Sequence, residues 1–163
     1  MKTLLILRHA KSSWKHTGLA DHDRPLNKRG KRDAPRMGEL LREEDLLPDL
    51  ILSSSAKRAR TTGELFSETS GYEGEFRVNR DLYAHYAGVY LDMLSDLGED
   101  YERVMVIGHN PGLEELVEEL TGDWIRMPTA ALAVVELPIQ DWSDLSEETQ
   151  GELVNFWQPK ELA

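Results

Sequence analysis

Three apolar runs of the sequence each lead into side chains that can bind an anion or carry out nucleophilic and acid–base chemistry. Arg8 and His9 follow LLIL directly, His109 follows VMVIG, and Arg58 comes shortly after LILS. A buried strand gains nothing from a guanidinium or an imidazole group at its end. A guanidinium fork matches the oxygens of phosphate, and imidazole acts as a nucleophile or as an acid and base near neutral pH. These four side chains therefore predict a site for a small anion.

The apolar runs themselves have the character of buried strands. They are continuous rather than alternating, which is typical of parallel strands covered on both faces. We predict such strands at 3–7, 49–53 and 103–108, a further strand at 130–137, and an edge strand at 152–157. Parallel strands present their carboxyl ends at one edge of a sheet, where open α/β folds bind ligands. The four side chains are therefore expected to meet in one pocket.

Between these strands, apolar residues recur at helical spacing, which predicts helices over residues 27–45, after the Ser-rich segment at 53–55, and over 88–98 and 109–122. Helices whose N-termini lie at the same edge as the pocket would direct N–H groups toward an anion. Strands that alternate with helices predict a three-layer α/β/α fold with a mostly parallel central sheet. We expect one domain, residues 1–163.

Helix boundaries give further expectations. Ser54 or Ser55 is expected to cap the second helix, and Asn110 to cap the fourth. Pro35 lies inside the first helix and predicts a kink or a restart near that point.

Net charge restricts the partners. The chain of 163 residues has 30 acidic and 19 basic residues and a net charge of −11. Such an acidic chain repels nucleic acid and anionic membrane surfaces, and we expect neither as a partner. Most of the basic residues nevertheless lie in the first 60 positions, which favours a local anion site. For Lys28 to Arg36 a solvated helix face is the simpler interpretation.

The compartment is constrained by what the chain does not contain. It has no cysteine, which excludes disulfides and thiolate chemistry and is compatible with a reducing cytoplasm. The N-terminus has no signal-peptide pattern, and no apolar window is long enough for a membrane span. We therefore expect a cytoplasmic protein.

Several segments resemble, in the same order, the motifs of the histidine phosphatase superfamily, the phosphoglycerate mutase-like proteins. LLILRHAKSSW resembles its Arg-His-Gly signature, and VIGHNPGLEEL resembles its second histidine motif. The other matching segments are DRPLNKRG (23–30), SSSAKRARTT (53–62), which resembles the second arginine motif, and MPTAAL (127–132). The short length and the GHNPGLEEL form are most similar to the SixA-type phosphohistidine phosphatases.

The resemblance implies a phosphoglycerate mutase-like fold and a phosphatase that needs neither metal nor cofactor. His9 would be the nucleophile that becomes phosphorylated, Arg8 and Arg58 would clamp the phosphoryl oxygens, and His109 would complete the clamp. Ser12 either donates to the phosphate or caps the following helix. Arg60, two residues after Arg58 on the same helix, is expected to face elsewhere.

The implied substrate is the phosphohistidine of a protein. The alternatives are a small phosphomonoester, or a phospho-ligand that is bound without turnover. The retained His9 favours catalysis, because a pure binding module has no use for a nucleophile. A mutase is disfavoured, because the chain is too short for insertions that would enclose a bisphosphate.

Two positions depart from the family pattern. Ala10 replaces the glycine of the signature, which is tolerable where φ is negative. Ala84 stands where many members carry a general-acid glutamate. Expelling an alkoxide needs a proton donor, worth roughly a hundredfold in rate, whereas a protonated phosphohistidine needs less help. Ala84 therefore favours phosphohistidine as the substrate, with Asp21, Asp23 and His85 as less favoured proton donors.

The segment HTGLADHDRP (16–25) offers a rival interpretation. Its His16, Asp21, His22 and Asp23 are suitable ligands for a divalent metal, but turn chemistry explains them more simply.

The tryptophans are assigned mainly to packing. Trp14 is expected to line the rim of the pocket. Trp124, Trp142 and Trp157 are expected to pack in the core or at the edge of the sheet.

Overall fold

The computed structural model describes residues 1–84, 86–98 and 100–162. The described residues form a six-stranded sheet in the order β3-β2-β4-β1-β5-β6, in which only β5 runs antiparallel to its neighbours. The strands are β1 (Lys2–Arg8), β2 (Leu50–Ser54), β3 (Glu75–Asn79), β4 (Arg103–Gly108), β5 (Leu132–Leu137) and β6 (Glu152–Trp157).

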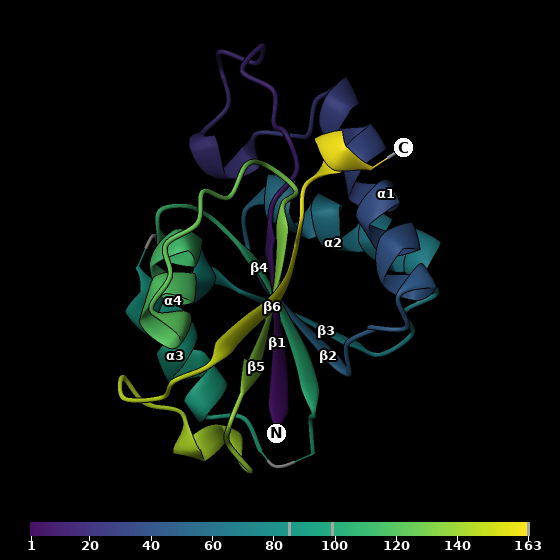
Figure 1. Ribbon diagram of the computed structural model, residues 1–163. Helices are drawn as coiled ribbons and strands as arrows, with labels where there is room; N and C mark the ends of the chain where they lie inside the picture. The colour runs from purple at the N-terminus through teal and green to yellow at the C-terminus, as the bar shows by residue number, and fades with distance from the viewer. Residues whose placement is uncertain (85, 99, 163) are drawn as a thin grey trace.

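Helices cover both faces of this sheet, as Figure 1 shows. Helices α1 (Lys28–Glu43) and α2 (Lys57–Ser70) lie on one side, and α3 (Ala87–Ser95) and α4 (Gly112–Thr121) lie on the other. Short 3-10 turns add η1 (Asp21–Asp23), η2 (Arg80–Tyr83), η3 (Trp142–Asp144) and η4 (Pro159–Glu161). The expected three-layer α/β/α fold with a mostly parallel central sheet is thus confirmed.

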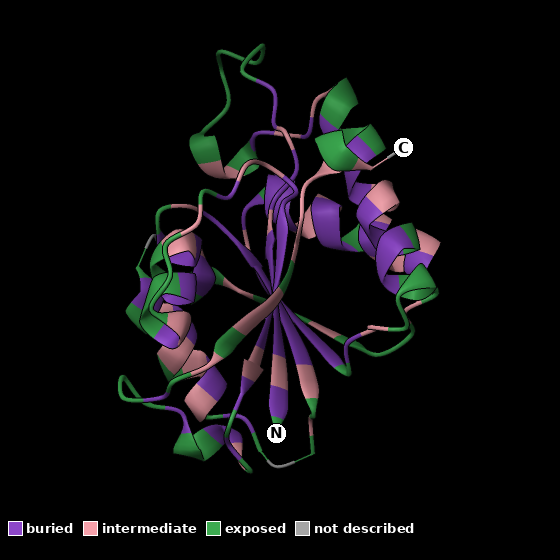
Figure 2. Cartoon of the chain, in the orientation of Figure 1, coloured by how far each residue is buried: buried purple, intermediate pink, exposed green. Residues whose placement is uncertain are grey.

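The four central strands, β1, β2, β4 and β5, are buried on both faces because alternate side chains enter two separate cores (Figure 2). On β1, Leu5 and Leu7 pack under α1 and α2, whereas Leu4 and Ile6 pack under α3 and α4. All four are fully buried. The continuous apolar runs of the sequence follow directly from this double coverage.

The edge strand β3 was not among the predicted strands. It is short, carries Glu75 and Arg77, and is largely exposed, so that it lacks the apolar pattern of a covered strand. At the opposite edge of the sheet, β6 occupies the predicted segment 152–157. The pattern therefore identified strands that bury both faces and missed one that buries little.

Several boundary expectations were wrong. Helix α1 passes Pro35 without a restart, as one uninterrupted helix. Ala56 is the N-cap of α2, and the Ser54 hydroxyl instead accepts a bond from the Ala56 N–H at 3.1 Å. Pro111 is the N-cap of α4, because the side-chain amide of Asn110 is turned away to donate to the carbonyl oxygen of Met127 at 2.8 Å.

The tryptophan expectations held in part. Trp142 is fully buried and Trp157 is half-buried on β6, but Trp124 is exposed, contrary to its expected packing role. Searched for membrane spans, the described part of the chain contains no helix of sufficient length and apolarity.

Candidate active site

The carboxyl ends of β1, β2 and β4 meet at the edge of the sheet that lies at the top of Figure 1. A hollow of about 200 Å³ opens there, and its lining includes every site residue predicted from the sequence: Arg8, His9, Ser12, Arg58 and His109. Lys11, Trp14, Arg24, Asn110 and Thr129 complete the lining. The structure thus brings together side chains that lie as much as a hundred positions apart, as the parallel sheet predicts.

His9 is held as a neutral imidazole with a defined tautomer. Its Nδ1 lies 2.8 Å from the carbonyl oxygen of Ala10. Because a carbonyl oxygen only accepts, Nδ1 carries the proton and Nε2 keeps its lone pair. Burial, aided by the charges of Arg58 and Arg8, lowers the pKa of His9 to about 3. The ring is therefore neutral throughout the physiological pH range, with the lone pair of Nε2 available.

Arg8 and Arg58 each have a buried N–H group that makes no hydrogen bond to a described residue. Nη1 of Arg8 donates to the carbonyl oxygen of Met127 at 3.0 Å, and Nη1 of Arg58 donates to that of Asp21 at 2.8 Å. The Nε atom of each guanidinium is buried and has no partner among the described residues. Since a buried donor without a partner is costly, two of them beside one hollow indicate that an anion completes the site.

Thr62 joins the two elements that carry His9 and Arg58. Its hydroxyl donates to the carbonyl oxygen of Arg58 at 2.7 Å and accepts from the N–H of Ala10 at 2.9 Å. Ala10 is buried and is not among the residues with positive φ, so the departure from glycine leaves the signature turn unstrained. The end of β1 and the first turn of α2 are therefore fixed relative to each other.

His109 stands beside His9, with the ring centroids 5.1 Å apart. Its Nε2 is paired with the hydroxyl of Ser54 at 2.7 Å, and its backbone N–H donates to the Tyr90 hydroxyl at 3.2 Å. The edge of the Tyr83 ring packs against it at a centroid distance of 5.6 Å. These contacts fix the orientation of the second imidazole at the hollow.

Asp21, considered from the sequence only as a turn residue, a less favoured proton donor and a possible metal ligand, instead contacts an arginine of the site. Its carboxylate accepts hydrogen bonds from Nη2 of Arg58 at 3.1 Å and from the Tyr83 hydroxyl at 2.5 Å. Nε of Arg24 donates to its other oxygen at 3.0 Å. Although burial by itself raises the pKa of the Asp21 carboxyl, the Tyr83 hydrogen bond and the Arg58 charge outweigh it and hold the pKa well below its usual range. Asp21 is thus an anion that tethers Arg58.

The remaining sequence candidates are placed as follows. Ser12 accepts a hydrogen bond from Nη1 of Arg24 at 2.7 Å, and it caps no helix, because Asn27 is the N-cap of α1. Arg60 is absent from the lining and donates to the carbonyl oxygen of Ser55 at 2.9 Å. Trp14 lies at the rim as expected.

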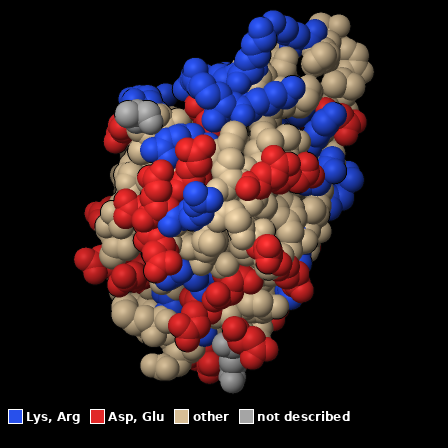
Figure 3. Space-filling model, turned by 90° about the vertical axis from the view of Figure 1, so that its right-hand side faces the viewer, with Lys and Arg blue, Asp and Glu red and all other residues tan. Residues whose placement is uncertain are grey.

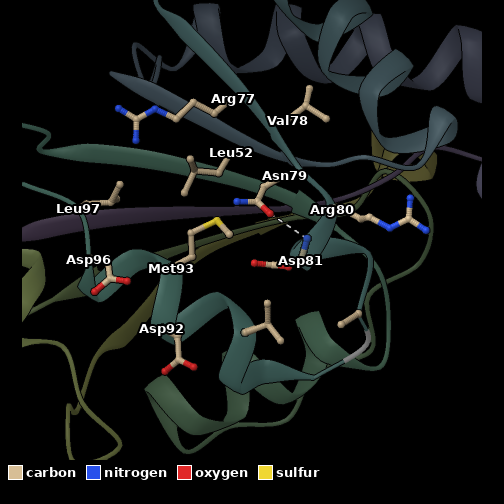
Figure 4. A pocket seen from close by; sticks show the side chains of 12 residues that line it. Leu52, Arg77, Val78, Asn79, Arg80, Asp81, Asp92, Met93, Asp96 and Leu97 are labelled. Atoms are coloured by element: carbon tan, nitrogen blue, oxygen red, sulfur yellow. Dashed lines mark hydrogen bonds between the residues drawn. The ribbon is translucent and has the colours of Figure 1, made fainter.

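Ala84 lies outside the hollow. It ends η2 and lines a different cavity of about 1000 Å³, between β3 and α3, whose walls include Leu52, Met93 and Asp81 (Figure 4). His85, another candidate proton donor, lies outside the described residues. Asp23 is exposed in η1. Of the carboxylates considered from the sequence, Asp21 alone reaches the site within the part of the chain described.

The segment 16–25 is arranged by turn and ion-pair contacts. Asp21 is engaged by Arg24 and Arg58, and His22 pairs with the Ser55 hydroxyl at 2.8 Å. Among the described residues, no group of three or more histidine, aspartate or glutamate side chains is placed to hold a metal ion.

Sequence comparison identifies relatives over most of the chain. Residues 4–107 match the histidine phosphatase superfamily (branch 1). An uncharacterized chloroplastic protein of Arabidopsis thaliana is 34% identical over 152 residues, which cover 88% of this chain and 70% of that protein.

Solved structures match the whole fold. The putative phosphohistidine phosphatase SixA from Agrobacterium tumefaciens superimposes with a TM-score of 0.84 and 28% identity, over 97% of this chain and 98% of that one. The protein histidine phosphatase SixA complexed with tungstate gives a TM-score of 0.84 at 25% identity, over 99% of both chains.

A half-buried arginine, a buried arginine and a neutral histidine lie together at the carboxyl edge of a mostly parallel sheet in an α/β protein, an arrangement suited to binding an oxyanion. The match over residues 4–107 specifies the family: the chain belongs to the histidine phosphatase superfamily, branch 1. The expected similarity to SixA-type proteins is confirmed by the structures that it resembles.

Proposed function

We propose that the protein is a phosphatase that transfers the phosphoryl group of its substrate to His9 and then to water, with no metal or cofactor in either step. The buried Nε donors of Arg8 and Arg58, which lack a partner beside a neutral His9, are the observation that carries the proposal. A phosphoryl group in the hollow would accept from both donors while its phosphorus faces the nucleophile.

In the first step, the lone pair of His9 Nε2 attacks phosphorus. A P–N bond forms and the bond from phosphorus to the leaving group breaks; a phosphohistidine that is already protonated on its ring leaves as neutral imidazole and takes up no further proton. Arg8, Arg58 and His109 stabilise the charge on the three transferred oxygens. In the second step a water molecule attacks phosphorus, the P–Nε2 bond breaks, and inorganic phosphate leaves the regenerated neutral His9.

The substrate that fits this site is the phosphohistidine of a protein. Asp21 is an anion and holds no proton to give, and its hydrogen bond raises the pKa of the Tyr83 hydroxyl, which makes Tyr83 a poor donor. A site without a strong acid expels an alkoxide slowly, whereas imidazole leaves as a neutral molecule from protonated phosphohistidine. The structural similarity to the protein histidine phosphatase SixA supports this choice.

The test uses two synthetic peptides of the same sequence, one with a central phosphohistidine and one with a central phosphoserine. We expect the wild-type protein to release phosphate from the phosphohistidine peptide at least a hundredfold faster. His9→Ala should abolish release and the acid-labile phosphoenzyme, whereas His16→Ala, an exposed histidine of the same segment, should retain both.

Three outcomes contradict the proposal, each in a different part. Substantial turnover by His9→Ala would remove His9 as the nucleophile. Tight binding of the phosphohistidine peptide without phosphate release would make the protein a phospho-ligand-binding module. Faster turnover of the phosphoserine peptide would keep the mechanism and assign the site to phosphomonoesters.

A further inference from the structure

The loop after β1 and the first turn of α1 carry four lysines and a tryptophan, which we call the basic rim: Lys11, Trp14, Lys15, Lys28 and Lys31. Lys11 and Trp14 line the hollow itself. The first turn of α1 is joined to this loop, because the N–H of Asn27 donates to the carbonyl oxygen of Lys11 at 3.0 Å. Figure 3 shows basic side chains gathered at this end of the molecule, with acidic side chains over the surface below.

The lysines of the basic rim are free of internal partners, unlike the arginines next to them. Arg29 and Arg32 pair with Asp33 of the same helix. Lys15, Lys28 and Lys31 are exposed and Lys11 is half-buried, and none of the four forms an ion pair with a described residue. Their charges are thus available to an external anionic group.

The position of Lys28 and Lys31 is unfavourable for the helix that carries them. The N-terminus of a helix has a positive partial charge and favours acidic side chains, yet the first turn of α1 contains none. A solvated helix face, the simpler interpretation of this segment from its sequence, would be served equally well by neutral or acidic residues. An arrangement that opposes local stability is better explained by a role in binding.

Trp14 gives the basic rim an aromatic contact site. It is 72% exposed, and its ring stacks on the guanidinium group of Arg24, which lies 3.5 Å from the ring centroid. Arg24 is itself buried and held by Asp21 and Ser12, so the exposed ring rests on a fixed support. Exposed tryptophans next to arginine are characteristic of the energetic centres of protein interfaces.

We infer that the basic rim is a docking surface for an acidic protein surface that surrounds the phosphorylated side chain; this rests on the proposed function. The hollow of about 200 Å³ accommodates little more than the phosphoryl group and its attachment. The basic rim extends outside it, over the loop and the start of α1, where a small phosphoester would make no contact. A protein substrate would place carboxylates there while its phosphorylated side chain enters the hollow.

A protein surface fits this patch better than nucleic acid or a membrane does. Four lysines allow few phosphate contacts, whereas binding of nucleic acid depends on neutralising many phosphates. The rest of the chain, with a net charge of −11, repels an extended polyanion and an anionic bilayer alike. A small patch in an acidic surface instead matches a partner that is acidic only around its modified residue.

The test compares two phosphohistidine peptides, one with glutamates and one with serines on both sides of the modified residue. We expect wild-type kcat/KM to be about tenfold higher for the acidic peptide at low salt, a preference that disappears near 0.2 M salt. Lys28→Glu combined with Lys31→Glu should abolish the preference and leave turnover of the serine-flanked peptide within about twofold. These changes also suit the helix N-terminus, so the variant is expected to fold.

The matched control lies on the same helix. Lys28→Glu alone should reduce the preference about threefold, whereas Arg42→Glu, about 21 Å farther along α1, should leave it unchanged. Equal effects of the two would show that only net charge matters and would overturn the inference.

Three other results separate the possibilities. Equal turnover of both peptides by the wild-type protein would refute the basic rim and leave the proposed function intact. No turnover of either peptide would refute the proposed function. Binding of phosphatidylglycerol vesicles or a 20-nucleotide DNA strand, lost in the double variant, would assign the patch to a membrane or to nucleic acid and overturn the inference.

Discussion

Replacing Arg58 by lysine separates the charge of this side chain from the geometry of its fork. In the structure, Nη1 and Nη2 donate to Asp21, whereas Nε is buried and has no partner among the described residues. We therefore expect one guanidinium to hold the loop and the phosphoryl group at the same time. An ammonium group offers its donors at a single point and reaches either Asp21 or the phosphoryl group, but not both.

The expected magnitudes follow from these contacts. Losing a preorganised donor to the transferred oxygens costs about 10² to 10³ in kcat, or about 3 to 4 kcal/mol, and we expect this for Arg58→Ala. Arg58→Lys keeps the charge and loses one charge-assisted hydrogen bond of about 1.5 to 3 kcal/mol, which corresponds to a decrease of about 10- to 100-fold. The side chain of Arg58 is only 5% exposed, so solvent screening reduces these values little.

Rapid-quench measurement of His9 phosphorylation by a phosphohistidine peptide provides the assay, and tungstate affinity reports ground-state binding separately. We expect Arg58→Ala to slow phosphorylation more than Arg58→Lys does. Thermal unfolding measurements are used to confirm that both variants fold. Asp21→Asn serves as the companion variant, because it removes the tether and keeps the arginine. If Arg58→Lys phosphorylates His9 within about twofold of the wild-type rate, the assigned role of the fork is wrong.

The other predictions concern the nucleophile, its neighbour and the loop. Burial lowers the pKa of His9 from 6.5 to about 3, so between these values the unfolded chain binds a proton that the native state does not, and the free energy of unfolding decreases as pH falls. Urea titrations should show the wild type losing about 2 kcal/mol more than His9→Gln between pH 7.5 and pH 5. Ser54→Ala removes the hydrogen bond to His109 and should lower kcat about tenfold, whereas Ser53→Ala, a control at the neighbouring buried serine, should leave kcat unchanged. Similar kcat values for the two variants would show that the Ser54 hydrogen bond does not orient the His109 ring. Gly30→Ala should destabilise the protein by about 1 to 3 kcal/mol, because the new methyl group would overlap a carbonyl oxygen of the loop. Gly88→Ala, which meets open space in a helix, should stabilise it by up to about 1 kcal/mol, and a stabilised Gly30 variant would contradict the tight loop contact.

The side chains at strand ends were predictable because sheet geometry determines where they go. Once 3–7 and 103–108 are assigned as parallel strands, the residues that follow must lie at one edge, which brings His9 and His109 together. Arg58 follows the same rule through the first turn of a helix after β2. No knowledge of loop conformation is needed for these placements.

Asp21 and Tyr83 were missed because their positions depend on the course of irregular segments. Each lies in a short 3-10 turn, at the end of a stretch with no apolar periodicity. The side chains meet across 62 positions of sequence. Asp21 was noted as a turn residue and a less favoured acid, and nothing in its spacing indicated an anion held by an arginine.

The partner of a polar side chain was equally hard to predict. Asn110 has the residue type and position of a helix cap, yet its amide binds the carbonyl oxygen of Met127. That carbonyl oxygen also accepts a hydrogen bond from Arg8, so the segment near residue 127 binds polar side chains at the ends of both β1 and β4. Local preference was overruled by a contact that only the tertiary fold supplies.

Strand β3 has a consequence for how the protein behaves when concentrated. It leaves one border of the sheet unpaired, and such borders are the usual templates for aggregation between molecules. Glu75 and Arg77 form an ion pair on this border, and burying both charges would oppose pairing with a second chain, although Val78, which follows Arg77, is exposed. Replacing both charged residues by valine would remove that barrier and create a short segment suited to fibril growth.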